Sequence, residues 1–168
     1  MEKLSLLIDR LSHHLGRTFS WLTLTMVVVM AVIVVLRYIF QIGSIALQES
    51  VIYINALIIT FGVAYTLKEQ GHVRVDIFYS RLEARRRAWV DLFGTLIFLI
   101  PSMLFIIWVS WDYVSVSWRI REGSAESSGL PFVFLLKLAI LLLPALLCLQ
   151  GVSELIKAVL IVRRRDSQ

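Results

Sequence analysis

The stretch Met26-Val-Val-Val-Met-Ala-Val-Ile-Val-Val-Leu36 consists of eleven apolar residues in succession. It lies at the centre of a longer apolar segment, residues 18–40. A helix of about 20 apolar residues crosses a hydrocarbon core of roughly 30 Å. Valine and isoleucine favour strands in water, but a segment in lipid must satisfy its own backbone hydrogen bonds, which favours a helix. We therefore predict a membrane-spanning helix here.

Three further apolar segments follow, at residues 45–67, 88–116 and 130–162. Hydrophobic residues make up 58% of the chain, above the 45–50% of ordinary soluble domains. We predict a single all-α, integral membrane domain, residues 1–168, with four transmembrane helices. Pro101 and Pro144 are expected to kink the third and fourth helices, and Pro131 is expected in the first turn of the fourth.

The positive charges predict the orientation across the membrane. Of the 17 Lys and Arg residues, 13 lie before the first span, between the second and third, or at the end of the chain. Because cytoplasmic segments carry the excess of positive charge, both termini and the 68–87 loop are expected in the cytoplasm. The turn 41–44 and the loop 117–129 would face outward. The net charge of +5 is explained by this arrangement, and we expect no nucleic acid partner.

Residues 1–16 predict a short amphipathic helix. Leucine and isoleucine recur at spacings of three and four and form one apolar stripe, at Leu4, Leu7, Ile8, Leu11 and Leu15. Such a helix either lies in the membrane interface or extends the first span into the cytoplasm, and the sequence supports both readings.

Three ionisable residues within the predicted spans are candidate contact sites, because charge at membrane depth is a functional hypothesis by default. Arg37 and Glu49 flank the tight turn between the first two spans, so their side chains are expected at similar depth. They pair with each other, pair with a partner subunit, extend to the interface, or line a transport path. Lys137 lies about two turns into the fourth span.

The outer loop brings acidic and basic residues together. Glu122 and Glu126 stand beside Arg119 and Arg121, so the loop is nearly neutral. We interpret it as a solvated or protein-docking surface. The middle of each span is formed by Val, Leu, Ile or Phe, which favours an accessory subunit whose partner carries the transport site.

No catalytic or metal-binding pattern is found in the sequence, so we expect a protein that is not an enzyme and carries no cofactor or metal. Cys148 is the single cysteine, and we interpret it as a small buried hydrophobe. Two other classes remain as alternatives, a stand-alone small membrane exporter and a four-helix membrane anchor of a redox complex. The anchor would need histidines inside the spans, where none is predicted.

Several motifs together resemble a known family, the small membrane subunit, of DctQ type, of tripartite ATP-independent periplasmic (TRAP) transporters. The motifs are Arg37-Tyr38, Gln48-Glu49, Phe61-Gly62, Gly71-His-Val-Arg-Val-Asp-Ile-Phe-Tyr79, Glu122-Gly-Ser-Ala-Glu-Ser-Ser-Gly-Leu-Pro131 and Lys137. The Gly-Leu-Pro loop looks more like the branch labelled mannitol/chloroaromatic. Ile45-Ala-Leu47 stands where many relatives have a tryptophan.

The resemblance implies a multi-pass protein of the bacterial cell inner membrane that works in secondary active transport. Its partners would be a large TRAP membrane subunit, which moves organic acids with sodium ions by an elevator-type motion, a periplasmic substrate-binding protein, and membrane lipid. This chain would be the fixed scaffold. Arg37, Glu49 and Lys137 would make subunit or interhelix contacts.

The resemblance also assigns roles to two loops. Gly71, His72, Arg74 and Asp76 would shape the cytoplasmic loop. The binding protein would dock on the outer residues, which are Arg119, Arg121, Glu122, Glu126, Gly129 and Pro131.

Overall fold

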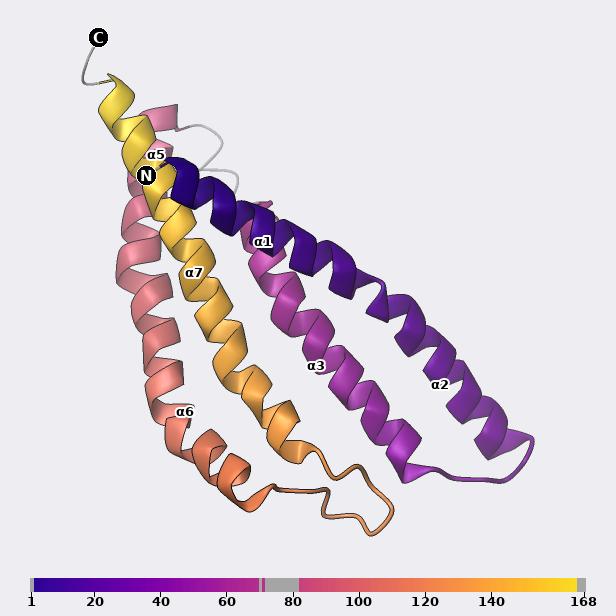
Figure 1. Ribbon diagram of the computed structural model, residues 1–168. Coiled ribbons are helices and arrows are strands. Elements are labelled where there is room, and N and C mark those ends of the chain that lie inside the picture. The colour runs from indigo at the N-terminus through magenta and orange to yellow at the C-terminus, as the bar shows by residue number, and fades with distance from the viewer. Residues whose placement is uncertain (1, 70, 72–81, 166–168) are drawn as a thin grey trace.

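The protein is seen in a computed structural model that describes residues 2–69, 71 and 82–165, and every regular element in this part is a helix. The elements are α1 (Glu2–Ser20), α2 (Leu22–Tyr38), α3 (Ile45–Lys68), α5 (Ala84–Phe93), the π-helix η1 (Gly94–Leu99), α6 (Ile100–Ile120) and α7 (Val133–Arg165). Figure 1 shows that the start of α1 and the end of α7 lie at one end of the bundle, and the loops after α2 and α6 at the other.

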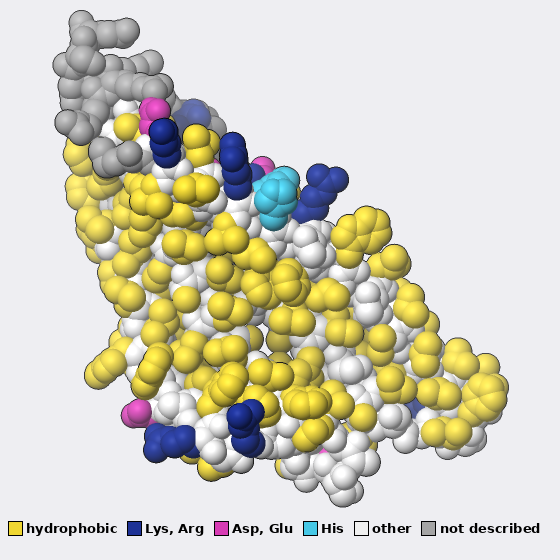
Figure 2. All heavy atoms as spheres, in the orientation of Figure 1, with side chains coloured by type: hydrophobic (Ala, Val, Ile, Leu, Met, Phe, Trp, Pro, Cys, Tyr) yellow, Lys and Arg dark blue, Asp and Glu magenta, His cyan; other side chains and the backbone are white. Residues whose placement is uncertain are grey.

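Four helical stretches in the described part are long and apolar enough to cross a membrane: Glu2–Tyr38, Ile45–Lys68, Arg85–Ile120 and Val133–Val162. Figure 2 shows apolar side chains over the middle of the molecule and charged side chains gathered toward its two ends. These observations confirm the all-α, four-helix membrane fold. The orientation across the membrane stays a prediction.

The first span is broken at Trp21, between α1 and α2. The Trp21 N–H lies 3.4 Å from the Thr18 carbonyl, so it does not make the regular bond to Arg17. The Ser20 hydroxyl donates to the Arg17 carbonyl instead, at 2.7 Å. The hydroxyl thus provides a hydrogen bond to the carbonyl that has lost its backbone donor at the break.

The inner face of α1 differs from the predicted leucine stripe. Ser5, Ile8, Ser12 and Gly16 are the buried residues of this helix. The leucines Leu4, Leu7 and Leu11 are 53%, 62% and 46% exposed, so only Ile8 of the predicted stripe is buried with them. Small side chains allow α1 to approach α3 and α7 closely, which large leucines would prevent.

The third span is longer than expected at both ends. Its helix begins at Ala84 and ends at Ile120, instead of covering 88–116. The π-helix Gly94–Leu99 precedes Pro101, and the Ile100 N–H donates to the Thr95 carbonyl in the π pattern. Proline lacks an N–H and its ring crowds the carbonyl four residues earlier, so a widened turn before it relieves the conflict.

The outer loop begins later than the expected Ser117. Arg121 adopts a left-handed conformation, with φ 51° and ψ 52°, and ends α6. The Glu122 N–H donates to the Ser117 carbonyl at 3.0 Å, which closes the helix in a Schellman motif. Since α7 begins at Val133, Pro131 precedes the fourth helix and does not lie in its first turn.

The long helix α7 is the centre of the packing. It contacts α1, α3, α5, α6 and η1, whereas α2 packs on α3 and on the end of α1. With 33 residues, α7 is about 50 Å long and exceeds the thickness of the hydrocarbon core. Pro144 lies inside it and is fully buried.

Candidate functional site

Glu49 fastens the outer loop to α3. Its Oε2 accepts a hydrogen bond of 2.6 Å from the Leu130 N–H, and its Oε1 accepts one from the Ser124 hydroxyl. Leu130 and Ser124 are themselves joined across the loop, since the Ser124 N–H donates to the Leu130 carbonyl at 3.0 Å. One carboxylate therefore holds both sides of the loop.

Arg37 does not pair with Glu49. Its side chain is exposed at the end of α2, where basic residues favour the helix dipole. In the part of the chain that the structure describes, Arg37 makes no ion pair. Of the arrangements weighed from the sequence, an exposed arginine fits a contact with another subunit or with the membrane interface.

Lys137 attaches the start of the same loop to α7. Its Nζ lies 2.5 Å from Glu122 Oε2 and 3.9 Å from the centre of the Tyr113 ring. The lysine side chain is only 14% exposed. Lys137 on α7 therefore contacts both α6 and the first residue after Arg121. The hydrogen bond from Lys137 lowers the pKa of Glu122 below its ordinary value.

Glu122 begins the loop that we interpret from the sequence as a solvated or protein-docking surface, and its side chain is ion-paired and half-buried. Glu126 is exposed at the tip of the loop, where its carbonyl accepts from the Gly129 N–H at 3.0 Å. Arg119 is exposed, and the Arg121 guanidinium lies 5.5 Å from the centre of the Phe134 ring. The outer surface is thus a fixed loop with an exposed tip.

Gly129 lies at the end of this loop, against Ser124 and Glu49. A Cβ on Gly129 would lie 2.3 Å from Ser124 Oγ and 2.7 Å from Glu49 Oε1, so the Glu49 contacts leave no room for a side chain. Pro131 is exposed just before α7. The Gly-Leu-Pro segment therefore has a structural reason: it lets the Leu130 N–H reach Glu49.

Of the four loop residues expected in the cytoplasm, Gly71, His72, Arg74 and Asp76, only Gly71 is in the described part. The Gly71 N–H donates to the Thr66 carbonyl at 2.9 Å and closes the end of α3. A Cβ on Gly71 would come within 3.2 Å of Thr66 Cγ2. His72, Arg74 and Asp76 lie outside the described residues.

A polar network at the opposite end was missed by the sequence analysis. Gln150 on α7 is fully buried and faces α1. Its Oε1 accepts a hydrogen bond of 2.7 Å from Ser12, and its Nε2 donates to Asp9 Oδ1 at 3.0 Å and to Glu154 Oε1 at 3.2 Å. Because its partners come from α1 and α7, Gln150 joins the two helices.

The network continues toward the ends of the chain. Ser153 Oγ lies 2.8 Å from Asp9 Oδ1 and 3.0 Å from Ser5 Oγ. The Lys157 ammonium lies 2.8 Å from Asp9 Oδ2 and 2.8 Å from Glu154 Oε1. Buried polar groups of this kind specify one packing when all are satisfied. The sequence signal was the small polar face of α1, Ser5, Ser12 and Gly16, which lies beside the leucine stripe.

The joint between α1 and α3 is also close-packed. A Cβ on Gly16 would lie 2.4 Å from Tyr65 Cβ. The rings of Phe19 and Phe61 stack with their centres 3.9 Å apart. These contacts of α1 with α3 add to its polar contacts with α7 and to the packing of α7 on α3 and α6.

These polar contacts can hold neighbouring helices together. The described residues include no group of three or more His, Cys, Asp or Glu side chains that could hold a metal ion. The polar contacts lie at the two ends of the helices. Between them the outward faces of α2 and α6 are apolar and exposed, for example Val28 at 55% and Phe105 at 61%.

Comparison with known proteins identifies one matching family. The family model described as "Tripartite ATP-independent periplasmic transporters, DctQ component" matches residues 26–160, well over half of the chain. No curated protein and no solved structure matches the sequence.

Proposed function

The chain belongs to the family of DctQ components of tripartite ATP-independent periplasmic transporters, and on this premise we propose that it is the fixed scaffold of such a transporter. Membership makes it the small membrane subunit of a TRAP system and confirms the resemblance seen in the sequence. Together with the four spanning helices, it makes the chain a multi-pass membrane protein. The scaffold role is the function that the geometry supports best.

The observation that supports the proposal is that charged side chains in the helices bind to other groups of the same chain. Glu49, Lys137 and Lys157 are each bound by groups of this same chain. A residue that binds cargo must exchange partners during transport, whereas these residues hold a loop or a neighbouring helix. Such contacts suit a part that stays still while a partner moves.

Further parts of the proposal rest on the family. The large membrane subunit would carry organic acids together with sodium ions, and this chain would hold no ion or cofactor and perform no catalysis. The complex would lie in the bacterial inner membrane with both termini of this chain in the cytoplasm. The exposed helix faces would receive the large subunit and lipid.

The outer loop is the proposed docking surface for the binding protein. Its base is fixed by Glu49 and Lys137, while Arg119, Glu126 and the residues between Ser124 and Gly129 are exposed. A fixed loop loses little conformational entropy when a partner binds. Charges of both signs at its tip would orient the partner.

Uptake by the reconstituted system tests the proposal. Proteoliposomes with this chain, its large membrane partner and the binding protein should accumulate substrate when a sodium gradient is imposed. Vesicles without this chain should lose most of the uptake, and vesicles with this chain alone should show none. Accumulation or proton-coupled efflux by this chain alone would favour a stand-alone transporter and contradict the scaffold role.

A further inference from the structure

A crevice of about 370 Å³ lies where α1 passes into α2 and both face α3. It is separate from the outer loop and from the polar network between α1 and α7. Its lining combines polar side chains, such as His13, Arg17 and Thr66, with the apolar Ile58 and the bare backbone of Gly62. The helix break at Trp21 and the missing side chain at position 62 both make room for it.

The space beside Gly62 is not filled by neighbouring side chains. A Cβ added to Gly62 would meet no atom within 4 Å, in contrast to Gly16, which is in close contact with Tyr65 on the same crevice. A larger side chain at position 62 would therefore enter the crevice without disturbing the helix contacts around it.

The crevice runs along α3 from a polar end at Thr66 to an apolar end at Ile58, and the hydroxyl residues Ser20 and Thr23 also line it. Thr66 lies in the last turn of α3, and Ile58 lies eight residues earlier, about 12 Å deeper along the helix. Trp21, which is 70% exposed, stands next to the crevice, and tryptophan is typical of the headgroup level of a membrane. The polar end is thus at the depth of lipid headgroups and the apolar end at the depth of acyl chains.

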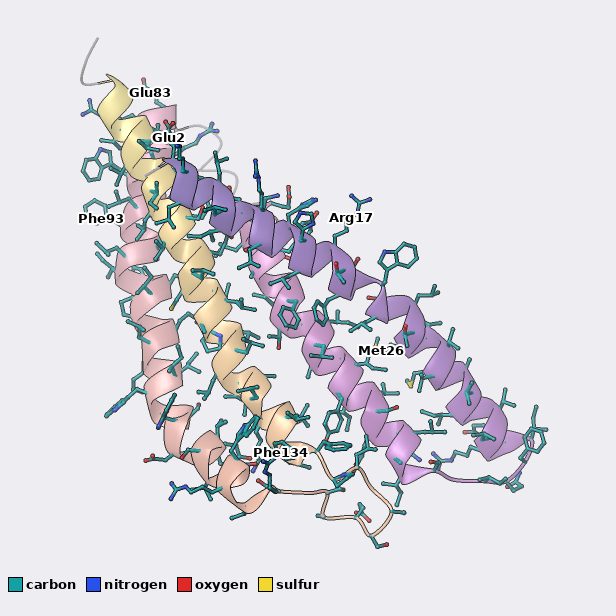
Figure 3. All side chains as sticks on the ribbon, viewed as in Figure 1. Glu2, Arg17, Met26, Glu83, Phe93 and Phe134 are labelled. Atoms are coloured by element: carbon teal, nitrogen blue, oxygen red, sulfur yellow. The ribbon has the colours of Figure 1, made fainter. Side chains whose placement is uncertain are left out.

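The polar end is positively charged. Arg17 is exposed at the end of α1, and Figure 3 shows it beside the joint with α2. The nearby acid, Glu69, is already paired with Lys68, since Glu69 Oε1 lies 2.6 Å from Lys68 Nζ. His13 Nδ1 lies 3.4 Å from the same ammonium and 3.8 Å from Glu69 Oε1, so His13 belongs to this group of contacts. Among the described residues no acidic side chain pairs with Arg17, and its charge is available there for an anion.

We propose that this crevice binds one anionic phospholipid. The Arg17 guanidinium receives the lipid phosphate, for which its planar donors are suited. An acyl chain runs past Gly62 and Ile58 along α3. The lipid would fill the joint of α1, α2 and α3 at the end of the bundle that holds both termini. This inference needs the chain to span a membrane and does not depend on the scaffold role.

Native mass spectrometry of the full chain tests the proposal. The chain is released from nanodiscs made of equal parts phosphatidylglycerol and phosphatidylcholine, and the retained lipid is counted. We expect one retained phosphatidylglycerol. Arg17→Gln should reduce its retention about fivefold, the effect expected for one cation at a membrane surface. The matched control Arg10→Gln removes an exposed arginine of the same helix that does not line the crevice, and should change nothing.

A steric variant tests the cavity itself. Gly62→Leu fills the crevice and should abolish retention of phosphatidylglycerol, while Gly94→Leu, which also adds a side chain to open space, should retain it. Circular dichroism of each variant checks that the helices are formed. Equal losses in Arg17→Gln and Arg10→Gln, or full retention in a folded Gly62→Leu, would overturn the proposal. So would displacement of the lipid by millimolar inorganic phosphate, because the site would then take a free anion.

Discussion

Single residues at the outer end determine whether the loop after α6 has one conformation. Glu49 accepts hydrogen bonds from both sides of this loop, and Lys137 binds Glu122 at its start. Sequence analysis selected Glu49 and Lys137 as candidate contact residues, yet it did not identify their partners. The partners are a serine hydroxyl, a backbone N–H and a carboxylate, and nothing in the pattern of charges distinguishes them from solvent.

Gly129→Ala should loosen the outer loop. The new Cβ would lie within 3 Å of Ser124 Oγ and Glu49 Oε1, so the hydrogen bonds to Glu49 must lengthen or break. Overpacking of this kind costs about 1–3 kcal/mol. Hydrogen exchange of the amides in residues 121–132 should become faster. Gly43→Ala is the control, because a Cβ there meets no atom within 4 Å and should leave the exchange unchanged.

Acid should also loosen the loop. Because Lys137 lowers the pKa of Glu122 below its ordinary 4.5, the ion pair stabilises the folded loop at pH values above 4.5 and is lost as pH falls through the lowered pKa. A fluorophore on Ser127 should therefore report a constant environment from pH 7 to about 5 and a change below the ordinary pKa. Glu122→Gln should already show the loosened environment at pH 7. An identical acid response in wild type and Glu122→Gln would assign the transition to another group.

At the scale of the elements, α1 packs differently from most amphipathic helices. The helix turns Ser5, Ser12 and Gly16 inward and leaves Leu4, Leu7 and Leu11 exposed. Periodicity predicted the helix and its leucine stripe, but it did not identify the small face that packs inside the bundle. Next to a membrane the leucines can remain in contact with lipid, and the small face then allows close contact with α3 and α7.

Gly16→Ala should move α1 away from α3. Although alanine favours a helix over glycine by about 1 kcal/mol, its Cβ would lie 2.4 Å from Tyr65 Cβ. We expect the clash to dominate and to lower the stability by about 1–3 kcal/mol. Thermal unfolding in detergent gives the comparison, with Gly62→Ala as the control in open space. A Gly16→Ala protein as stable as wild type would show that α1 is not seated on Tyr65.

Gln150→Leu should weaken the attachment of α1 to α7. Leucine has a similar volume but cannot accept from Ser12 or donate to Asp9, and each unsatisfied buried group costs about 1–3 kcal/mol. Amides of α1 should exchange faster than in wild type. Gln48→Leu replaces an exposed glutamine on α3 and should leave α1 unaffected. Unchanged protection of α1 in Gln150→Leu would mean that apolar contacts alone hold this helix.

The ends of the elements were harder to predict than their existence. Apolar runs such as Met26–Leu36 predicted the spans, because lipid permits few alternatives to a helix. The end of α6 was misplaced because a left-handed arginine, Arg121, takes the place where a glycine usually signals the stop. Sequence analysis separated a helix at residues 1–16 from a span at 18–40 as one of two alternatives, but it did not place the break at Trp21, where the Ser20 hydroxyl replaces one backbone hydrogen bond.

At the scale of the whole molecule, the hydrogen bonds and ion pairs that hold the helices together lie at the two ends, and apolar surface lies between them. Figure 2 shows this division, and α7 joins the ends because it contacts both the outer loop and α1. Composition predicted the membrane fold, and the resemblance of several motifs to a known family predicted the transporter family. They could not predict the network around Gln150, because its members are scattered over positions 5–157 and meet only after folding.

The measurement that tests the scaffold role most directly is a distance within this chain during transport. With Cys148→Ser as background, spin labels at Val34 and Val109, both exposed, report the separation of α2 and α6 in the reconstituted three-part system. The account predicts the same distance distribution with and without substrate and a sodium gradient. A shift of that distribution when transport begins would show that this subunit moves with the cargo and would contradict the account.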